Sequence, residues 1–251
     1  MDKRKAAIVD ILETVGQASV QDLAQRFAVS GMTIRRDLDE LRRLGLVVRT
    51  HGGAISSGKL RFIHSALPES EISEAKSAIG KRAAELVEPG QTVMVDTGTT
   101  ALEVARHLPH DLGITVVTTS LGVAQELYRS GLAVFVLGGF LRREFPSVYG
   151  SVTEKLLEEI RVDILFMGCD GASSDDGFYT NDLHVSSIEQ AMIRVADRVV
   201  VVTESAKFGR RAFARYALVE GADIVVTDAC ISPEDRRNLT ERGITLIVAD
   251  G

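Results

Sequence analysis

Residues 32–41, MTIRRDLDEL, decide the fold of the front of this chain. Ile34, Leu38 and Leu41 recur at the spacing of one face of an α-helix, which predicts that they form its buried stripe. With about 100° of rotation per residue, Arg36 then points away from the stripe and Arg35 lies at its flank. The stretch therefore predicts an amphipathic helix that presents two arginines to its surroundings.

Two shorter helices are expected before this one. Apolar residues at positions 8, 11, 12 and 15 and at positions 20, 23, 24 and 27 follow a helical period, and Gly16 separates the two sets. Ser19 and Ser30 precede the second and third helices, and serine is a favoured N-cap residue. The third helix is expected to run to about Leu44 and to stop at Gly45.

The segment after Gly45, LVVRTHGGA, predicts a short strand followed by a turn at Gly52–Gly53. A basic strand and turn beside three helices is typical of a wing that contacts the sugar-phosphate backbone or a minor groove of DNA. In a helix-turn-helix, the first residues of the second helix enter the major groove, where arginine matches a guanine edge or a phosphate. The candidate DNA-binding residues are Ser30, Met32, Thr33, Arg35, Arg36, Arg49 and His51.

A plain alternative exists for the arginines, because such pairs are often only solvated, and Arg36–Glu40 or Arg35–Asp39 would be ordinary pairs within one helix. The distribution of charge bears on this choice. Residues 1–59 carry ten Lys and Arg against seven Asp and Glu, a charge of +3, whereas residues 60–251 carry 19 against 28, a charge of −9. A polyanionic partner such as DNA would explain the positive charge of residues 1–59. Chance would also explain it, because an excess of three positive charges is small. The complete order of helices, cap and wing favours DNA.

The rest of the chain alternates between helical stretches and short apolar runs rich in β-branched residues. This alternation predicts a mostly parallel, buried sheet. Helices are expected at 73–87, 100–108, 121–129, 151–160, 184–197 and 233–242. The expected strands are TVMVD at 92–96, ITVVT at 114–118, LAVFVL at 132–137, DILFMG at 163–168, RVVVVT at 198–203, DIVVT at 223–227 and ITLIV at 244–248.

Ligands of such sheets bind beyond the carboxyl ends of the strands, so the residues that follow each run are the candidates for a site. Hydroxyls, glycines and a helix start are suited to phosphate, a carboxylate to sugar hydroxyls, and a lysine to an anion. Taken singly, each of these residues is also an ordinary cap, turn or surface residue. The candidate effector-binding residues are Asp96, Thr97, Gly98, Thr99, Thr100, Thr119, Ser120, Gly138, Gly139, Asp170 and Lys207.

The composition indicates the cellular compartment in which the protein is expected. Cys169 and Cys230 are far apart and in no metal-like spacing, which argues for a reducing compartment without a disulfide framework. The first ten residues, MDKRKAAIVD, contain no long apolar run and no visible signal peptide, and no stretch approaches a membrane span. We therefore expect a cytoplasmic protein with no cofactor and no metal.

The run VSGMTIRRDLDELRRLGLVVRTHGGA resembles the signature of DeoR-type bacterial transcription regulators. The segments DTGTT, TTS, LGG, GCDG, AMI and SAKFG, together with Gly150, resemble the effector domain of the same family. The resemblance covers nearly the whole chain. It implies a winged helix-turn-helix at 1–57, a linker at 58–72, and an α/β domain at 73–251 that is similar in fold to ribose-5-phosphate isomerase.

The resemblance also implies what the protein binds. We expect a repressor of a carbohydrate-metabolism operon that binds duplex operator DNA as a dimer or tetramer and is released by a phosphorylated sugar. The residues that match the DNA-facing positions of the family are Thr33, Arg35 and Arg36, and Asp37 is expected to orient a neighbouring arginine or to cap locally. The matching effector positions are Asp96, Gly98, Thr99, Thr100, Asp170 and Lys207.

Three departures from the family pattern alter the expected effector site. Thr119 stands where the family has Asn, and Glu204 stands where it has Asp. The stretch that reads E-A-x-x-K in the family has Val185 and Glu189 at its two charged positions, which changes the charge around any ligand. The alternative to a regulator is a sugar-phosphate isomerase-like enzyme, for which Val185 occupies the position of the expected glutamate base.

Overall fold

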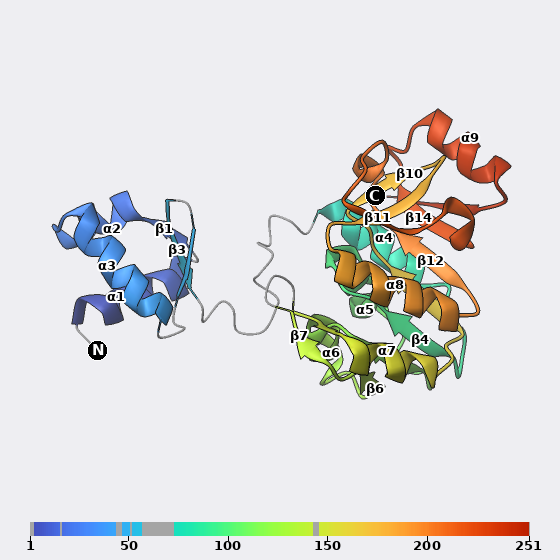
Figure 1. Ribbon diagram of the computed structural model, residues 1–251, viewed down its shortest axis with the longest axis horizontal. Coiled ribbons are helices and arrows are strands. Elements are labelled where there is room, and N and C mark those ends of the chain that lie inside the picture. Colours follow the sequence, from blue (N-terminus) through green and yellow to red (C-terminus); the bar gives the residue numbers. More distant parts are fainter. Residues whose placement is uncertain are drawn as a thin grey trace. The chain divides into compact units, whose positions relative to one another are not determined.

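The computed structural model describes residues 3–15, 17–43, 47–50, 52–56, 73–142 and 146–250. The chain divides into two compact units, Met1–Pro68 and Glu69–Gly251 (Figure 1). Each unit has its own hydrophobic core, as expected for independent domains.

The N-terminal unit consists of three helices and a small antiparallel sheet. The helices are α1 (Lys3–Val15), α2 (Val20–Phe27) and α3 (Gly31–Arg43). The sheet has the order β1-β3-β2, built from β1 (Gln17–Ser19), β2 (Val47–Arg49) and β3 (Gly53–Ser56). This confirms the expected winged helix-turn-helix, to which the structure adds β1, a strand that the sequence did not indicate.

The core of this unit follows the predicted helical stripes. Ile34, Leu38 and Leu41 of α3 are completely buried, together with Ile8 and Leu12 of α1. The turn between α2 and α3 is tight. Ala28 adopts a left-handed conformation with φ 52°, and the N–H of Val29 donates a hydrogen bond to the carbonyl of Ala24. The stripe predicted from spacing alone is therefore the one that holds α3 against its neighbours.

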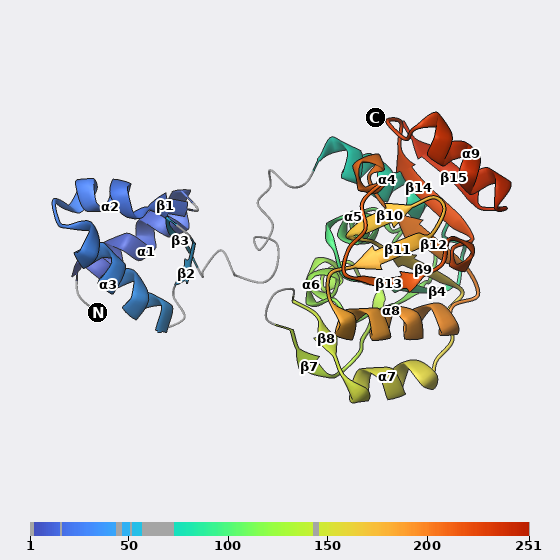
Figure 2. The same ribbon diagram turned by 45° about the horizontal axis from the view of Figure 1, so that its top comes forward.

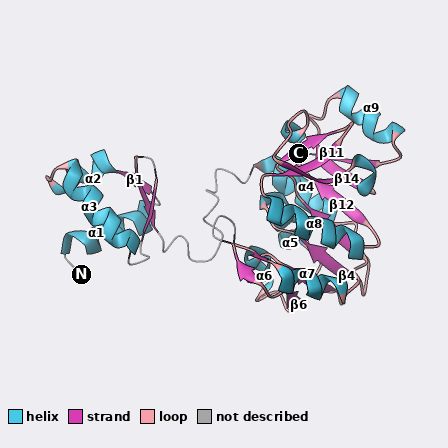
Figure 3. Cartoon of the chain, viewed as in Figure 1, coloured by secondary structure: helices cyan, strands magenta, loops and turns pink. Residues whose placement is uncertain are grey.

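The C-terminal unit is built on a seven-stranded parallel sheet with the order β15-β14-β12-β9-β4-β5-β6 (Figure 3). All seven strands coincide with the apolar runs predicted from the sequence. They are β4 (Thr92–Val95), β5 (Thr115–Thr118), β6 (Ala133–Val136), β9 (Ile164–Met167), β12 (Val199–Val202), β14 (Ile224–Asp228) and β15 (Thr245–Ala249).

Helices cover both faces of this sheet, and alternate residues of each strand face opposite cores. Val93 and Val95 of β4 belong to the cluster beneath α4 (Glu74–Ala84), α5 (Thr99–His107) and α6 (Leu121–Leu127). Met94 belongs to the cluster with α7 (Ser151–Glu158), α8 (Leu183–Val195) and α9 (Pro233–Glu241). Figure 2 shows α7 and α8 beside one another. Burial on both faces explains why these strands read as continuous apolar runs.

Some elements were not predicted. A second, antiparallel sheet joins β10 (Gly171–Ser173), β11 (Gly177–Thr180) and β13 (Ala214–Ala217), and β7 (Phe140–Leu141) pairs with β8 (Val148–Tyr149). Short turns are formed by η2 (Ser205–Lys207) and η3 (Val219–Gly221). The expectation of burial is wrong for β6, because this strand is the edge of the sheet and leaves Phe135 45% and Val136 40% exposed.

Candidate nucleic-acid interface and effector site

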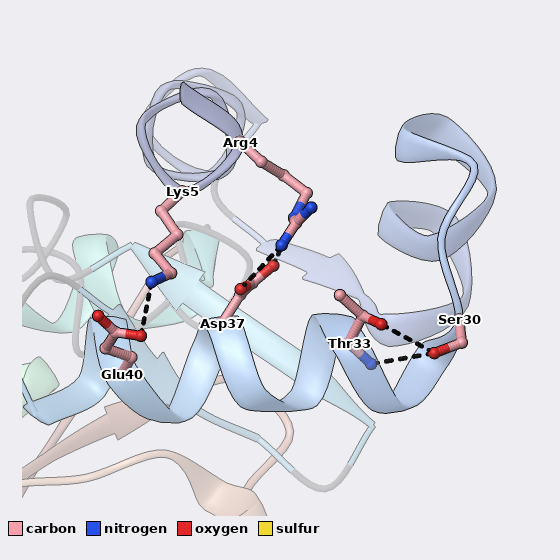
Figure 4. Close-up of polar contacts among 6 residues, drawn as sticks. All are labelled: Arg4, Lys5, Ser30, Thr33, Asp37 and Glu40. Carbon is pink, nitrogen blue, oxygen red and sulfur yellow. Dashed lines mark hydrogen bonds and ion pairs between the residues drawn. The ribbon is translucent and has the colours of Figure 1, made fainter. Parts of the chain in front are cut away.

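The start of α3 is fixed by a side-chain cap, as the sequence predicted. The backbone N–H of Thr33 donates to Ser30 Oγ at 3.2 Å, and the hydroxyls of the two residues lie 2.9 Å apart (Figure 4). Met32 is 66% exposed, and Arg35 and Arg36 are also exposed. The first turns of α3 therefore present a thioether and two guanidinium groups at the surface of the unit, beside the half-buried hydroxyl of Thr33.

The acidic residues of α3 hold this helix to α1. Arg4 Nε donates to Asp37 Oδ2 at 2.6 Å, and Lys5 Nζ lies 2.5 Å from Glu40 Oε2 (Figure 4). Asp37 is only 5% exposed, and it binds an arginine as predicted, although that arginine comes from another helix. The carboxylate of Glu40 is bound to Lys5 of α1, and the described residues contain no ion pair between Arg36 and Glu40, the pair considered as an alternative.

The wing is attached through a close backbone approach. The N–H of Val20 donates to the carbonyl of Gly52 at 2.8 Å, and the N–H of Thr50 donates to the carbonyl of Gly53 at 3.1 Å. A Cβ on Gly53 would lie 2.1 Å from the carbonyl oxygen of Ala18, so only glycine fits there. The backbone of Arg49 lies in β2 opposite Ala54. His51 lies outside the described residues.

In the C-terminal unit, the strand order reverses between β4 and β9. The chain passes from β4 outward to β5 and β6, then returns to β9 on the other side of β4. In open parallel sheets, a crevice forms outside the carboxyl ends of the strands at such a reversal. The predicted segments that contain Asp96 and Asp170 follow these two neighbouring strands, and the structure thus brings them to one end of the sheet.

The loop after β4 contains a buried carboxyl, that of Asp96, and leads into the start of α5, which has no side-chain cap. Asp96 is 4% exposed, and this burial is the main cause that raises the pKa of its carboxyl to about 7. The N–H of Thr97 and the charge of Arg142 act in the opposite direction and lower this pKa. Gly98 has φ 131°, a conformation that suits glycine, and a side chain there would meet nothing within 4 Å. Thr99 and Thr100 then begin α5. The free N–H groups of this helix start are therefore combined with two hydroxyls.

The loops after β5 and β6 are arranged differently. Ser120 caps α6 by accepting the N–H of Val123, and Thr119 is 1% exposed, so both side chains are buried in the loop. Gly139 has φ 158°, and a Cβ there would lie 2.2 Å from Thr153 Oγ1, whose hydroxyl donates to the carbonyl of Gly138. Burial or contacts within the fold constrain these four candidates, and their role in effector binding stays a prediction.

The loops after β9 and β12 add charges of both signs. Asp170 is exposed and accepts the backbone N–H of Asn181. The neighbouring thiol of Cys169 donates to Thr203 Oγ1 at 3.2 Å, and burial raises the pKa of the thiol to about 12. Lys207, at the end of η2, is half-buried and lowers this pKa through its charge. The lysine is thereby placed near the end of β9.

Asp228 fixes the turn that carries Lys207. Its carboxylate accepts the N–H of Ser205 at 2.7 Å and the hydroxyl of Ser205 at 2.6 Å. These hydrogen bonds lower the pKa of Asp228, although its partial burial acts in the opposite direction. Asp228 lies at the end of β14, and the sequence analysis did not single it out.

Three further charged residues join the site. Glu189 on α8 is 5% exposed, and the pKa of its carboxyl is raised well above the usual range, first by burial and then by Asp96 and Asp170. Arg142 lies 3.2 Å from the carboxylate of Asp182, the N-cap of α8, and its charge lowers the pKa of both Asp96 and Glu189. The sequence marks Glu189 only as a change of charge, and no local pattern indicates Arg142 or Asp182.

Among the described residues, no three His, Cys, Asp or Glu side chains are grouped as the ligands of one metal ion. In the same part of the chain, no helix combines the length and apolar composition needed to cross a bilayer.

Comparison with known proteins identifies the family. Residues 4–59 match the DeoR-like helix-turn-helix domain, and residues 71–229 match the DeoR C terminal sensor domain. The chain belongs to the DeoR family of transcription regulators. The resemblance inferred from the sequence is thereby confirmed, and with it the assignment as a DNA-binding regulator.

Relatives of this DeoR-family chain match it over nearly its full length. The HTH-type transcriptional regulator GlpR of Haloferax volcanii is 35% identical over 248 residues, which covers 98% of this chain and 96% of that protein. The glycerol-3-phosphate regulon repressor of Escherichia coli is 30% identical over an alignment of 256 residues, which covers 97% of each chain. A ribose 5-phosphate isomerase A from Methanocaldococcus jannaschii aligns with 53% of this chain and 53% of its own, with 20% identity and a TM-score of 0.39.

Proposed function

We propose that this chain represses a carbohydrate-metabolism operon by binding its operator as an oligomer, and that a phosphorylated sugar releases it. The proposal is carried by two features that occur in one chain. The first turn of α3 is exposed and capped. In the second unit, charged residues gather where the strand order of the parallel sheet reverses. The first feature is suited to DNA, and the second to a small anionic ligand.

The DNA interface is proposed to be the start of α3 with the wing. Arg35 and Arg36 are exposed there, and a guanidinium group forms two parallel hydrogen bonds with a guanine edge or a phosphate. Ser30, Met32 and Thr33 lie at the same end of the helix, where the N–H groups favour phosphate. Arg49 and His51 of the wing complete the proposed set.

The effector is proposed to bind with its phosphate at residues 97–100 and its sugar hydroxyls at the carboxyls. The start of α5 offers free N–H groups beside an open glycine, and Lys207 supplies a positive charge. Asp96 and Asp170 are acceptors for hydroxyl donors. The name of the glycerol-3-phosphate regulon repressor of Escherichia coli is consistent with a phosphorylated polyol or sugar as effector.

A route for the effector signal begins at Glu204, next to η2. Ser73, the N-cap of α4, donates its hydroxyl to Glu204 Oε1 at 2.7 Å, and Lys76 Nζ lies 3.5 Å from Glu204 Oε2. Ser73 is the first described residue after the segment that joins the two units. An effector that moves the turn of Lys207 therefore acts on the start of α4, and through the chain on the freedom of the DNA-binding unit.

Oligomerisation is proposed because one winged helix gives few contacts for specific binding, and paired units read two half-sites. The edge of the large sheet supports this proposal. Phe135 and Val136 of β6 are exposed at this edge, and in β7, the next strand along the chain, Phe140 and Leu141 are 66% and 65% exposed. We define these four residues as the β6 edge patch.

The test uses the full chain and labelled duplex DNA from upstream of its own reading frame. Anisotropy should show specific binding that falls steeply with salt, because released counterions drive the association. Addition of a matching phosphorylated sugar should lower the affinity, whereas the free sugar should not. Absence of any preference for this DNA over a scrambled duplex would contradict the repressor function.

The isomerase alternative rests on the buried carboxyl of Asp96, whose pKa of about 7 is suited to a general base. The same protein preparation should be incubated with ribose 5-phosphate and its ketose isomer. Interconversion at an enzymatic rate that Asp96→Asn abolishes would support an enzyme. A regulator predicts binding or release of DNA without turnover.

A further inference from the structure

Glu189 has a buried carboxyl oxygen that finds no hydrogen-bond partner in the part of the chain that the structure describes. Its side chain is 5% exposed, and among the described residues its Oε2 atom is shielded from solvent and has no hydrogen-bond partner. An unsatisfied buried acceptor costs free energy, so such a group is usually explained by a ligand or an ion. Glu189 faces the candidate effector site, because the charges of Asp96 and Asp170 both act on it.

The charges around Glu189 are mostly negative. Asp96 faces it from the end of β4, Asp170 from the end of β9, and Asp182 from the start of α8. The positive group that acts on it is Arg142, whose guanidinium also lies 3.2 Å from Asp182. Lys207 is placed near Cys169. Among the described residues, these four carboxyls are thus accompanied by two positive side chains, Arg142 and Lys207, and a bound phosphate adds about two further negative charges.

We propose that the effector of this chain carries a protonated amino group as well as its phosphate, and that Glu189 accepts a hydrogen bond from that ammonium. The inference rests on the proposed function, because it names the chemical class of the ligand for the same site. The class is an amino-sugar phosphate, with the phosphate at the start of α5 and the amine at Glu189.

An ammonium satisfies the site better than a hydroxyl does. A hydroxyl would give Oε2 its missing donor, but it would leave the excess negative charge unchanged. An ammonium supplies both the donor and the charge, and hydrogen bonds between charged groups are roughly twice as strong as neutral ones. Because the group is buried, the interaction is weakly screened.

Protons are expected to accompany binding. The carboxyls of Asp96 and Glu189 hold protons more strongly than usual, because burial raises the pKa of each, and the charge of Asp170 raises both further. An ammonium binds the ionised form, so its binding displaces a proton from this pair. The preference for an amino ligand should therefore increase as the pH rises, up to the pKa of the amine itself.

The test compares matched ligands that differ in one group. Glucosamine 6-phosphate is paired with glucose 6-phosphate, and galactosamine 6-phosphate with galactose 6-phosphate, in calorimetric titrations of the full chain. We expect at least one amino member to bind about tenfold or more tightly than its partner, as one added charge-assisted hydrogen bond predicts. Titration in buffers of different ionisation enthalpy should show proton release for that amino member only.

Glu189→Gln should reduce this preference to less than about threefold and abolish the proton release, while the hydroxy member still binds. Glu158→Gln removes the same charge from an exposed position on α7 and should keep the preference. If Glu189→Gln does not fold, the proton release of the native chain still tests the assignment. Equal binding within both pairs, or a preference that survives in Glu189→Gln, overturns it. Failure of every phosphorylated sugar to bind contradicts the proposed function instead.

Discussion

Arg36 and Ile34 lie two positions apart on α3, yet one is exposed and the other is completely buried. The helical period accounts for this difference, since it rotates neighbouring side chains by about 100°. The same period makes single substitutions in α3 selective: a change at Ile34 affects folding, whereas a change at Arg36 affects only what the surface binds. Arg36 is therefore the residue at which DNA recognition is tested most directly.

Arg36→Ala should weaken operator binding by about 1–3 kcal/mol without lowering the melting temperature. Arg36→Lys should keep part of the charge but lose a two-point contact with a base or phosphate. Anisotropy with operator and scrambled duplexes measures both effects. Arg129→Ala, at an exposed position on the other unit, is the control. An unchanged affinity in Arg36→Ala would exclude this residue from the interface.

Asp96 predicts an unusual dependence of stability on pH. Its pKa rises from 3.8 to about 7 on folding, so its stabilising effect is fully present below about pH 4 and is lost as the pH rises through 7. A shift of this size corresponds to at most about 4 kcal/mol. The difference in unfolding free energy between the native chain and Asp96→Asn should therefore fall between pH 5 and pH 8.

Chemical denaturation of the ligand-free protein at several pH values measures this difference. Asp111→Asn, which changes an exposed aspartate, should show no such trend. A native chain that gains stability relative to Asp96→Asn as the pH rises would show that folding lowers the pKa of Asp96 instead of raising it, and would contradict the prediction.

The sequence predicts the structural role of a residue when that role depends on residues a few positions away. Ser30 was predicted as a cap and Ile34 as core because a cap acts over three residues and a stripe over four. Glu189, Asp228 and Arg142 depend on contacts between distant segments, such as the hydrogen bond between Ser205 and Asp228. No local pattern marks such contacts, so only the folded structure reveals them.

At the scale of elements, the seven parallel strands were predictable because burial on both faces selects continuous apolar runs. The antiparallel strands β10, β11 and β13 were missed because their sequences, GAS, GFYT and ARYA, are short and mixed. The strand β6 was found, but its exposure was not, since an edge strand has the same composition as its buried neighbours. Composition thus indicates a strand without fixing its place in the sheet.

The contact between α4 and η2 yields a prediction about coupling. Ser73→Asp keeps an oxygen that caps α4 but places a negative charge against Glu204, whereas Ser73→Asn keeps a cap and can donate to Glu204. The effector should lower DNA affinity much less in Ser73→Asp than in the native chain, with Ser73→Asn close to native. Couplings of this kind are typically 5–150-fold, which anisotropy with and without effector resolves.

Equal effector responses in the two variants would show that this hydrogen bond does not carry the signal. Both proteins should retain the native melting temperature within a few degrees, because each keeps the cap of α4. A loss of folding in Ser73→Asp alone would assign the contact to stability.

At the scale of the whole molecule, the β6 edge patch predicts how copies of the chain associate. An edge strand with exposed apolar side chains is a template for pairing, and two copies related by a two-fold axis would cover each other's patch. Phe135→Lys should therefore shift the protein toward the monomer and weaken binding to an operator with two half-sites. Sedimentation velocity measures the first effect and anisotropy the second.

The control for this substitution is Phe213→Lys, which changes a phenylalanine that is 77% exposed outside the patch. It should leave the oligomeric state unchanged. An unaltered sedimentation profile for Phe135→Lys at low micromolar concentration would place the subunit interface elsewhere.

The close approach between Gly53 and the carbonyl of Ala18 has a consequence for genetics. Any other amino acid at position 53 would push the wing off β1, although the glycine itself has no side chain to offer to a base pair. A selection for constitutive expression of the target genes should therefore recover missense alleles at codon 53 beside those at codons 35 and 36. The codon 53 alleles would lower the amount of folded DNA-binding unit. The arginine alleles would leave this unit folded but without its preference for the operator sequence.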